Sequence, residues 1–205
     1  MKHTREVIEA GVPLAKAKKA LVLLHGRGAL AEDILELHSY FSLNDFYIIA
    51  PQATNHTWYP YSFLAPINQN EPWLSSALDV IKQIVDDIKK TISSENIFIM
   101  GFSQGACLTL EFATRYAQKW GGIISLTGGL IGDKIYNEHY AGNFNGTKVL
   151  ITNSPNDVHV PLQRSDDSKK LMEKMGATVS LEVYPNRPHT IIGDEIEKAK
   201  KILEG

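Results

Sequence analysis

Cysteine, net charge and long apolar runs are all scarce in this sequence of 205 residues. Because Cys107 is the only cysteine, an intramolecular disulfide is excluded. The 21 basic and 23 acidic residues leave a formal charge of −2, so no basic footprint for a nucleic acid is present. The longest aliphatic run, residues 20–24, is far shorter than the ~20 apolar residues that a membrane-spanning helix needs. These absences argue against a disulfide scaffold, a nucleic-acid partner and a transmembrane segment.

The N-terminal residues 1–14 carry charges where a secretory signal would need an apolar core, so we predict a cytoplasmic protein. No internal repeat, low-complexity tract or change in composition marks a linker. A chain of this length with 43% apolar residues closes around one core. We therefore expect a single domain over residues 1–205.

Two hydrophobic periodicities alternate along the chain. Short apolar runs rich in β-branched residues are typical of strands buried on both faces, and they occupy residues 20–25, 46–50, 97–100, 122–126, 148–152 and 179–184. Apolar residues at steps of three and four predict helices, which occupy residues 74–92, 106–118, 162–175 and 190–203. This alternation predicts an α/β fold, a mostly parallel sheet with helices on both faces.

Three further segments do not fit that alternation. Residues 5–14 are expected to form an antiparallel edge hairpin around Gly11. Residues 51–72 and 128–146 are predicted to be long loops, and loops of that length in a compact domain are often functional.

The residues Gly-Phe-Ser-Gln-Gly at 101–105 form a G-x-S-x-G pattern between the third of these strands and a helix. At such a tight turn a serine is held in a strained conformation with its hydroxyl above the sheet. The following helix presents free backbone N–H groups beside the place where an oxyanion would form. We therefore predict Ser103 as a nucleophile; the alternative is a structural serine in a glycine-bracketed turn.

A serine hydroxyl needs a base to take its proton. Among the seven histidines, His189 follows the last strand directly and so lies at the same sheet edge as Ser103. Solvated or structural roles are the expectation for His3, His38 and His139, whereas His25 and His56 are placed nearer the site. We predict His189 as the base.

The third member of such a triad is a carboxylate, and Asp157 follows the strand at 148–152. It would hold His189 in one tautomer and stabilise the imidazolium of the transition state. A turn aspartate that binds its own backbone is the alternative, and weaker candidates for the carboxylate are Asp133, Asp166 and Asp167. The order serine, aspartate, histidine is that of α/β-hydrolases, and all three lie where open α/β sheets bind ligands.

These motifs together resemble the phospholipase/carboxylesterase family of small α/β-hydrolases, which includes bacterial carboxylesterases and acyl-protein thioesterases. The resemblance rests on LHGRG at 24–28, GFSQGA at 101–106, DVHVP at 157–161 and the histidine after the last strand. It implies an α/β-hydrolase fold without a large cap domain and an oxyanion hole built from the backbone N–H groups of Arg27 and Gln104. Arg27 replaces the apolar residue that thioesterase members often carry, and residues 154–156 replace a glycine-led loop.

Two other functions compete with this interpretation. Residues 26–31 also fit the dinucleotide fingerprint G-x-G-x-x-A, but Gln52 stands at the strand end where an acidic residue would hold the ribose. A non-catalytic binding protein with a hydrolase fold is the second alternative, because fold alone does not secure activity. Since no phosphate-binding loop, H-E-x-x-H or C-x-x-C spacing occurs, we expect neither a cofactor nor a metal.

Large side chains crowd the loop at 51–72 and either wall a substrate pocket or pack the loop onto the domain; the candidates are Trp58, Tyr59, Tyr61, Phe63 and Leu64. Only 16 residues follow His189, which leaves little chain for a lid. Cys107 is expected to be a small buried apolar residue, and Arg27 to meet an anionic substrate group or a surface carboxylate.

We predict a serine hydrolase that cleaves carboxylic esters through an acyl-enzyme, with thioesters and lysophospholipids as further candidate substrates. The partner is a small-molecule substrate, and the sequence does not define an oligomeric state. The rate should rise with pH as the histidine base becomes neutral.

Overall fold

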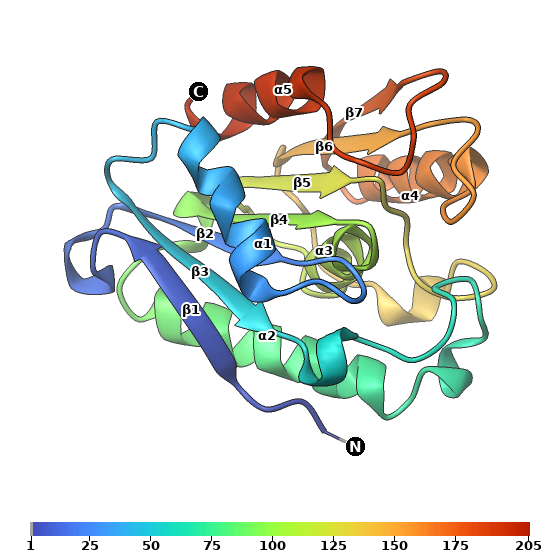
Figure 1. Cartoon of the computed structure of the whole chain (residues 1–205), viewed down its shortest axis with the longest axis horizontal. Helices are drawn as coiled ribbons and strands as arrows, with labels where there is room; N and C mark the ends of the chain where they lie inside the picture. The colour runs from blue at the N-terminus through green and yellow to red at the C-terminus, as the bar shows by residue number, and fades with distance from the viewer. Residues whose placement is uncertain (1) are drawn as a thin grey trace.

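Seven strands form one sheet in the order β1-β3-β2-β4-β5-β6-β7 in the computed structural model, which describes residues 2–205 (Figure 1). The strands are β1 Glu6–Gly11, β2 Lys19–Leu24, β3 Phe46–Gln52, β4 Ile97–Phe102, β5 Gly122–Leu126, β6 Lys148–Asn153 and β7 Thr178–Val183. The helices are α1 Ala31–Leu35, α2 Trp73–Lys89, α3 Gln104–Arg115, α4 Leu162–Lys174 and α5 Gly193–Leu203. All strand pairs are parallel except β1 with β3, which confirms the predicted α/β class.

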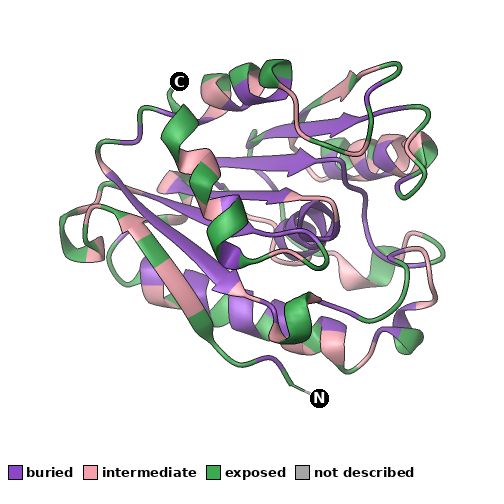
Figure 2. Cartoon of the chain, in the orientation of Figure 1, coloured by how far each residue is buried: buried purple, intermediate pink, exposed green. Residues whose placement is uncertain are grey.

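The helices lie in two layers, one on each face of the sheet (Figure 1). One core cluster joins α2, α3 and α4 to the sheet, and the other joins α1 and α5 to the opposite face. Strands β2 to β6 are buried almost throughout (Figure 2). Burial on both faces explains why these strands appear in the sequence as continuous apolar runs rather than as alternating patterns.

The expected hairpin at residues 5–14 is wrong, because only its first half is a strand. β1 is an edge strand and pairs only with β3, from Glu6 opposite Gln52 to Gly11 opposite Tyr47. Gly11 then turns the chain at a φ of 73°, where an added Cβ would lie 2.2 Å from the carbonyl oxygen of Phe46. Pro13 has no N–H to continue a ladder, so a short 3₁₀ turn follows in place of a second strand.

The two long loops are ordered by buried polar anchors. The Asn70 side chain accepts a hydrogen bond from the Tyr61 N–H at 2.9 Å and holds the middle of the first loop. The fully buried Glu111 carboxylate on α3 accepts hydrogen bonds from the Ile131 N–H at 3.0 Å and the Tyr140 hydroxyl at 2.9 Å. These hydrogen bonds hold the middle of the first loop together and tie the second loop to α3.

Parallel strands bring their carboxyl ends to one edge. Ser103 follows β4, Asp157 lies beyond β6, and His189 lies between β7 and α5. Among residues 2–205, no helix combines the length and hydropathy needed to cross a membrane.

Candidate active site

The turn between β4 and α3 holds Ser103 in an unusual backbone conformation, with φ 54° and ψ −116°. Its N–H donates to the carbonyl of Leu126 at the end of β5, at 3.0 Å, and its carbonyl accepts the N–H of Cys107 at 3.0 Å. A non-glycine residue with positive φ is strained, and such strain persists only where the surroundings over-determine it. The turn therefore projects the serine hydroxyl above the strand ends.

The glycines that flank Ser103 let backbone segments touch. A Cβ on Gly101 would lie 2.4 Å from the carbonyl oxygen of Gly105. A Cβ on Gly105 would lie 2.1 Å from the carbonyl oxygen of Leu24 on β2. Because these neighbours are backbone atoms, no side-chain movement relieves the overlap. The G-x-S-x-G pattern thus reports a close approach of α3 to two strands.

A continuous hydrogen-bonded chain joins Ser103, His189 and Asp157. The distance from Ser103 Oγ to His189 Nε2 is 2.7 Å, and that from His189 Nδ1 to Asp157 Oδ2 is also 2.7 Å. A carboxylate accepts only, so Nδ1 carries the proton in the neutral ring and Nε2 is free to accept from the serine hydroxyl. The structure thus brings together the three side chains predicted from the sequence.

The second oxygen of Asp157 anchors the carboxylate. Oδ1 accepts the backbone N–H groups of His159 at 2.9 Å and Val160 at 2.8 Å. Burial opposes the charged form, but the hydrogen bonds from His189 and from these two N–H groups outweigh it and lower the pKa of Asp157. The side chain binds its own turn, as the alternative interpretation proposed, and reaches His189 as well.

The backbone N–H groups of Arg27 and Gln104 are the predicted donors of an oxyanion hole. In the part of the chain that the structure describes, neither the Arg27 N–H nor the Gln104 N–H donates to a protein acceptor. Gln104 is the first residue of α3, where backbone N–H groups are free and the helix dipole is positive. A Cβ on Gly26 would lie 3.6 Å from the Ser103 Cβ, so the segment before Arg27 adjoins the serine.

His25 holds that segment and does not reach Ser103. Its Nδ1 donates to the carbonyl of Gly26 at 2.7 Å, and its Nε2 accepts the N–H of Ala53 at 3.0 Å. Burial lowers the pKa of His25, which favours this single neutral tautomer. The other nearby ring, His56, lies 3.3 Å from the carbonyl of Ala29. His189 is therefore the histidine that meets the serine.

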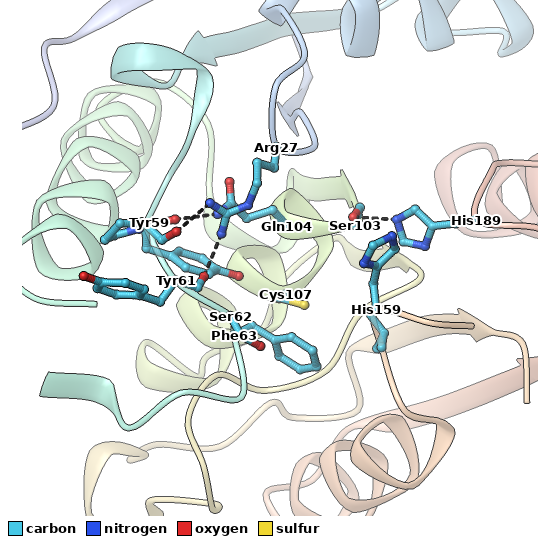
Figure 3. A pocket seen from close by; sticks show the side chains of 12 residues that line it. Arg27, Tyr59, Tyr61, Ser62, Phe63, Ser103, Gln104, Cys107, His159 and His189 are labelled. Carbon is cyan, nitrogen blue, oxygen red and sulfur yellow. Dashed lines mark hydrogen bonds between the residues drawn. The ribbon is translucent and has the colours of Figure 1, made fainter. Parts of the chain in front are cut away.

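A cavity of about 450 Å³ opens beside Ser103 (Figure 3). Of the five predicted wall residues, Tyr59, Tyr61 and Phe63 line it, whereas Trp58 and Leu64 do not. Trp58 is fully buried behind the wall, with its indole N–H donated to the carbonyl of His25 at 2.9 Å. For this side chain the loop-packing interpretation is correct. The cavity is also lined by His159, which the sequence analysis did not single out and whose ring lies edge-on to His189 at 4.7 Å.

The side chains of the two oxyanion-hole candidates clamp the cavity wall. Arg27 donates to the carbonyls of Pro60 at 2.8 Å and Tyr61 at 2.7 Å, and it forms no ion pair with a carboxylate among residues 2–205 (Figure 3). The Gln104 amide accepts the N–H of Trp58 at 3.0 Å and donates to the carbonyl of Tyr59 at 2.8 Å. These roles carry no sequence signal, because each partner is a backbone atom of a distant loop.

Two other predictions concern chemistry beside the triad. Cys107 is buried at the cavity floor, and burial raises the pKa of its thiol to about 12, as suits a packing residue. The Gln52 side chain accepts the Ala31 N–H at 2.8 Å and so occupies the start of α1, where a dinucleotide would place its phosphates. No cluster of three metal-binding side chains occurs among the described residues.

A mostly parallel sheet with a strained serine after its central strand, and an aspartate and a histidine at neighbouring strand ends, defines the α/β-hydrolase class. Within that class the chain belongs to the phospholipase/carboxylesterase family, whose model matches residues 3–205. This confirms the family that the sequence motifs resembled.

Individual relatives agree with this membership. The crystal structure of a phospholipase/carboxylesterase from Dyadobacter fermentans DSM 18053 is 49% identical, covers 100% of this chain and 99% of that chain, and superposes with a TM-score of 0.98. The Bacillus cereus carboxylesterase shares the fold, with 22% identity, 98% and 93% coverage and a TM-score of 0.78. Acyl-protein thioesterase 1 of Kluyveromyces lactis is 37% identical over 103 residues, which are 49% of this chain and 45% of that protein.

The chain spans about half the length of several curated relatives that it matches. Their names agree with the carboxylic ester hydrolase that the sequence predicts.

Proposed function

We propose that this chain is a serine hydrolase that cleaves small carboxylic esters through an acyl-enzyme intermediate. One observation carries the proposal: the unbroken 2.7 Å contacts from Asp157 to His189 and from His189 to Ser103, which open onto a cavity. An unreactive turn serine has no need of an oriented imidazole. The non-catalytic alternative leaves this alignment without a purpose.

In the proposed mechanism, Ser103 Oγ attacks the ester carbonyl carbon while His189 Nε2 takes the hydroxyl proton. The oxyanion that forms on the carbonyl oxygen accepts the N–H groups of Arg27 and Gln104. His189 then donates its proton to the leaving alcohol oxygen, which leaves an acyl group on Ser103. A water molecule gives a proton to His189 and attacks the acyl carbon. Collapse of the second oxyanion breaks the bond between the acyl carbon and Ser103 Oγ, releases the carboxylic acid, and returns the proton from His189 to Ser103 Oγ. Asp157 stabilises the transient imidazolium throughout.

The family and its named relatives make thioesters and lysophospholipids the next substrate classes to consider. A thioester would use the same steps with a sulfur leaving group. The cavity offers apolar surface from Tyr59, Phe63 and Cys107 for an acyl chain. We also propose that residues 1–205 act as one domain, since a single sheet carries every part of the site. A cytoplasmic location stays a prediction from the sequence.

The test compares hydrolysis of a short-chain aryl ester by the wild-type protein, Ser103→Ala and the control Ser180→Ala, which alters an exposed serine on β7. We expect Ser103→Ala to lose at least about 10³-fold in kcat and the control to match the wild type. A fluorophosphonate probe should label the wild type and the control alone. Undiminished hydrolysis by Ser103→Ala would refute the proposal. Separately, the rates of the wild-type protein on an ester, a thioester and a lysophospholipid rank the three substrate classes.

A further inference from the structure

The loop between β7 and α5 carries a buried arginine two residues before His189. The side chain of Arg187 is 1% exposed. Its Nη1 donates to the carbonyls of Pro188, at 3.4 Å, and Thr190, and its Nη2 donates to Thr127 Oγ1 at 2.7 Å. Pro188 and Thr190 are the two neighbours of His189 in the chain. One planar guanidinium therefore fixes the backbone on both sides of the histidine.

The acceptor Thr127 lies at the strand end that also holds the nucleophile. It directly follows β5, whose last carbonyl, that of Leu126, accepts the N–H of Ser103 at 3.0 Å. The end of β5 thus binds the serine backbone through one residue and Arg187 through the next. This path ties the backbones of Ser103 and His189 together without using either functional side chain.

A buried carboxylate balances the charge of Arg187. Glu195 on α5 is fully buried, and its Oε2 lies 3.8 Å from Arg187 Nη1. The same oxygen accepts the Ile192 N–H at 2.8 Å, and Oε1 accepts the hydroxyl of Thr152. Removing one charge of a buried pair leaves the other uncompensated, which is costly. Charge balance stabilises the fold, whereas the fork of hydrogen bonds sets the loop geometry.

We infer that Arg187 is a positioning residue, which holds the ring of His189 at hydrogen-bonding distance from Ser103. This inference rests on the proposed function, because it assigns Arg187 a part in the same reaction. A misplacement of about 1 Å can cost about 100-fold in rate. Lysine at this position keeps the charge beside Glu195 but presents a point charge, which cannot reproduce the planar fork. Stability and turnover should therefore separate in the Arg187→Lys variant.

The experiment measures kcat, KM and thermal unfolding for Arg187→Lys, Thr127→Val and Thr127→Ser. Valine and threonine are both β-branched, so Thr127→Val removes the hydroxyl acceptor and leaves the strain at φ 65° almost unchanged. We expect Arg187→Lys and Thr127→Val to lower kcat about 10- to 100-fold with KM changed less than about threefold. Thr127→Ser, which retains the hydroxyl, should recover most of the turnover. The control Lys198→Met breaks the more exposed ion pair between α5 and Glu182 and should leave kcat unchanged.

The Ser103→Ala variant separates the two proposals. If Ser103→Ala is inactive while Arg187→Lys and Thr127→Val keep kcat within about twofold of the wild type, the positioning role is wrong and the proposed function stands. A fall in activity that only follows the folded fraction, measured by circular dichroism, also overturns the positioning role. If Ser103→Ala retains activity, the proposed function itself fails.

Discussion

Ser103 lies on a turn whose shape is set by backbone packing, whereas His189 lies on a loop held by buried side-chain charges. The first turn depends on Gly101 and Gly105, which admit carbonyl groups at distances that no Cβ tolerates. The second depends on Arg187 and Glu195, which lie 3.8 Å apart as a buried ion pair and form hydrogen bonds with the surrounding backbone. Backbone contact tolerates almost no substitution and leaves a glycine signature. A network of side-chain contacts tolerates some substitutions with partial loss of function, and it leaves no short motif in the sequence.

The largest loss of activity is expected at Asp157, whose carboxylate binds His189. Asp157→Asn preserves the shape of the side chain but permits an amide N–H to face His189, which favours the wrong tautomer. We expect kcat to fall about 10³- to 10⁴-fold while the protein stays folded. Ester kinetics and circular dichroism measure the two properties.

Asp133→Asn is the matched control, because Asp133 was a rival candidate and its carboxylate binds the exposed Tyr136 hydroxyl at 2.6 Å. Comparable losses in the two variants would contradict the assignment of the triad carboxylate to Asp157.

The nucleophile turn should show the next largest effect, now on stability. Gly105→Ala would place a Cβ 2.1 Å from the carbonyl oxygen of Leu24, and relief requires movement of α3 away from β2. We expect a loss of about 3 kcal/mol in the free energy of unfolding, measured by urea titration.

Gly193→Ala provides the contrast at the start of α5, because nothing lies within 4 Å of its added Cβ. Alanine there should be neutral or stabilise by about 0.5 kcal/mol. If both substitutions had the same effect, tight backbone contact would not explain the glycine of the motif.

A moderate effect on substrate binding is expected at Arg27. Its side chain holds a loop through hydrogen bonds to backbone carbonyls, as the side chain of Arg187 does. Arg27→Ala keeps the backbone N–H but releases the carbonyls of Pro60 and Tyr61, so the cavity wall loosens. We expect KM to rise about 3- to 10-fold with a smaller change in kcat.

Lys134→Ala removes a cation that lies 5.0 Å from the Tyr136 ring, away from the cavity lining, and should leave both constants unchanged. A fall in kcat alone after Arg27→Ala would instead place this side chain in transition-state stabilisation.

The last prediction concerns the thiol of Cys107, one helical turn after Ser103, for which we expect no reactivity in the folded protein. Burial raises the pKa of its thiol to about 12, so the protonated form persists throughout the physiological range and thiolate appears only as pH approaches that value. We expect no reaction with a disulfide reagent at about pH 8 in the folded protein and complete reaction after denaturation. Rapid labelling of the native protein would show that the cavity floor opens.

Much of the fold was predictable because buried parallel strands and amphipathic helices have distinct periodicities. The edge at residues 5–14 was not, since a single antiparallel strand and a hairpin share one pattern until Pro13 ends the pairing. Ser103, Asp157 and His189 were predictable from their order and from the strand ends that they follow. The clamp by Gln104 and the anchor at Arg187 were not, because their partners are backbone atoms or residues far apart in sequence.

The buried His3 side chain joins the N-terminal segment to the loop whose later residues line the cavity. Its Nδ1 accepts the Thr54 N–H at 3.1 Å, its Nε2 lies 2.9 Å from the carbonyl of Trp58, and its ring packs against Trp58 and Trp73. Burial lowers the pKa of His3, so acidification charges a group that the fold holds neutral. Loss of the His3 side chain would therefore remove contacts to Thr54 and Trp58, which support the cavity lining from the side away from Ser103.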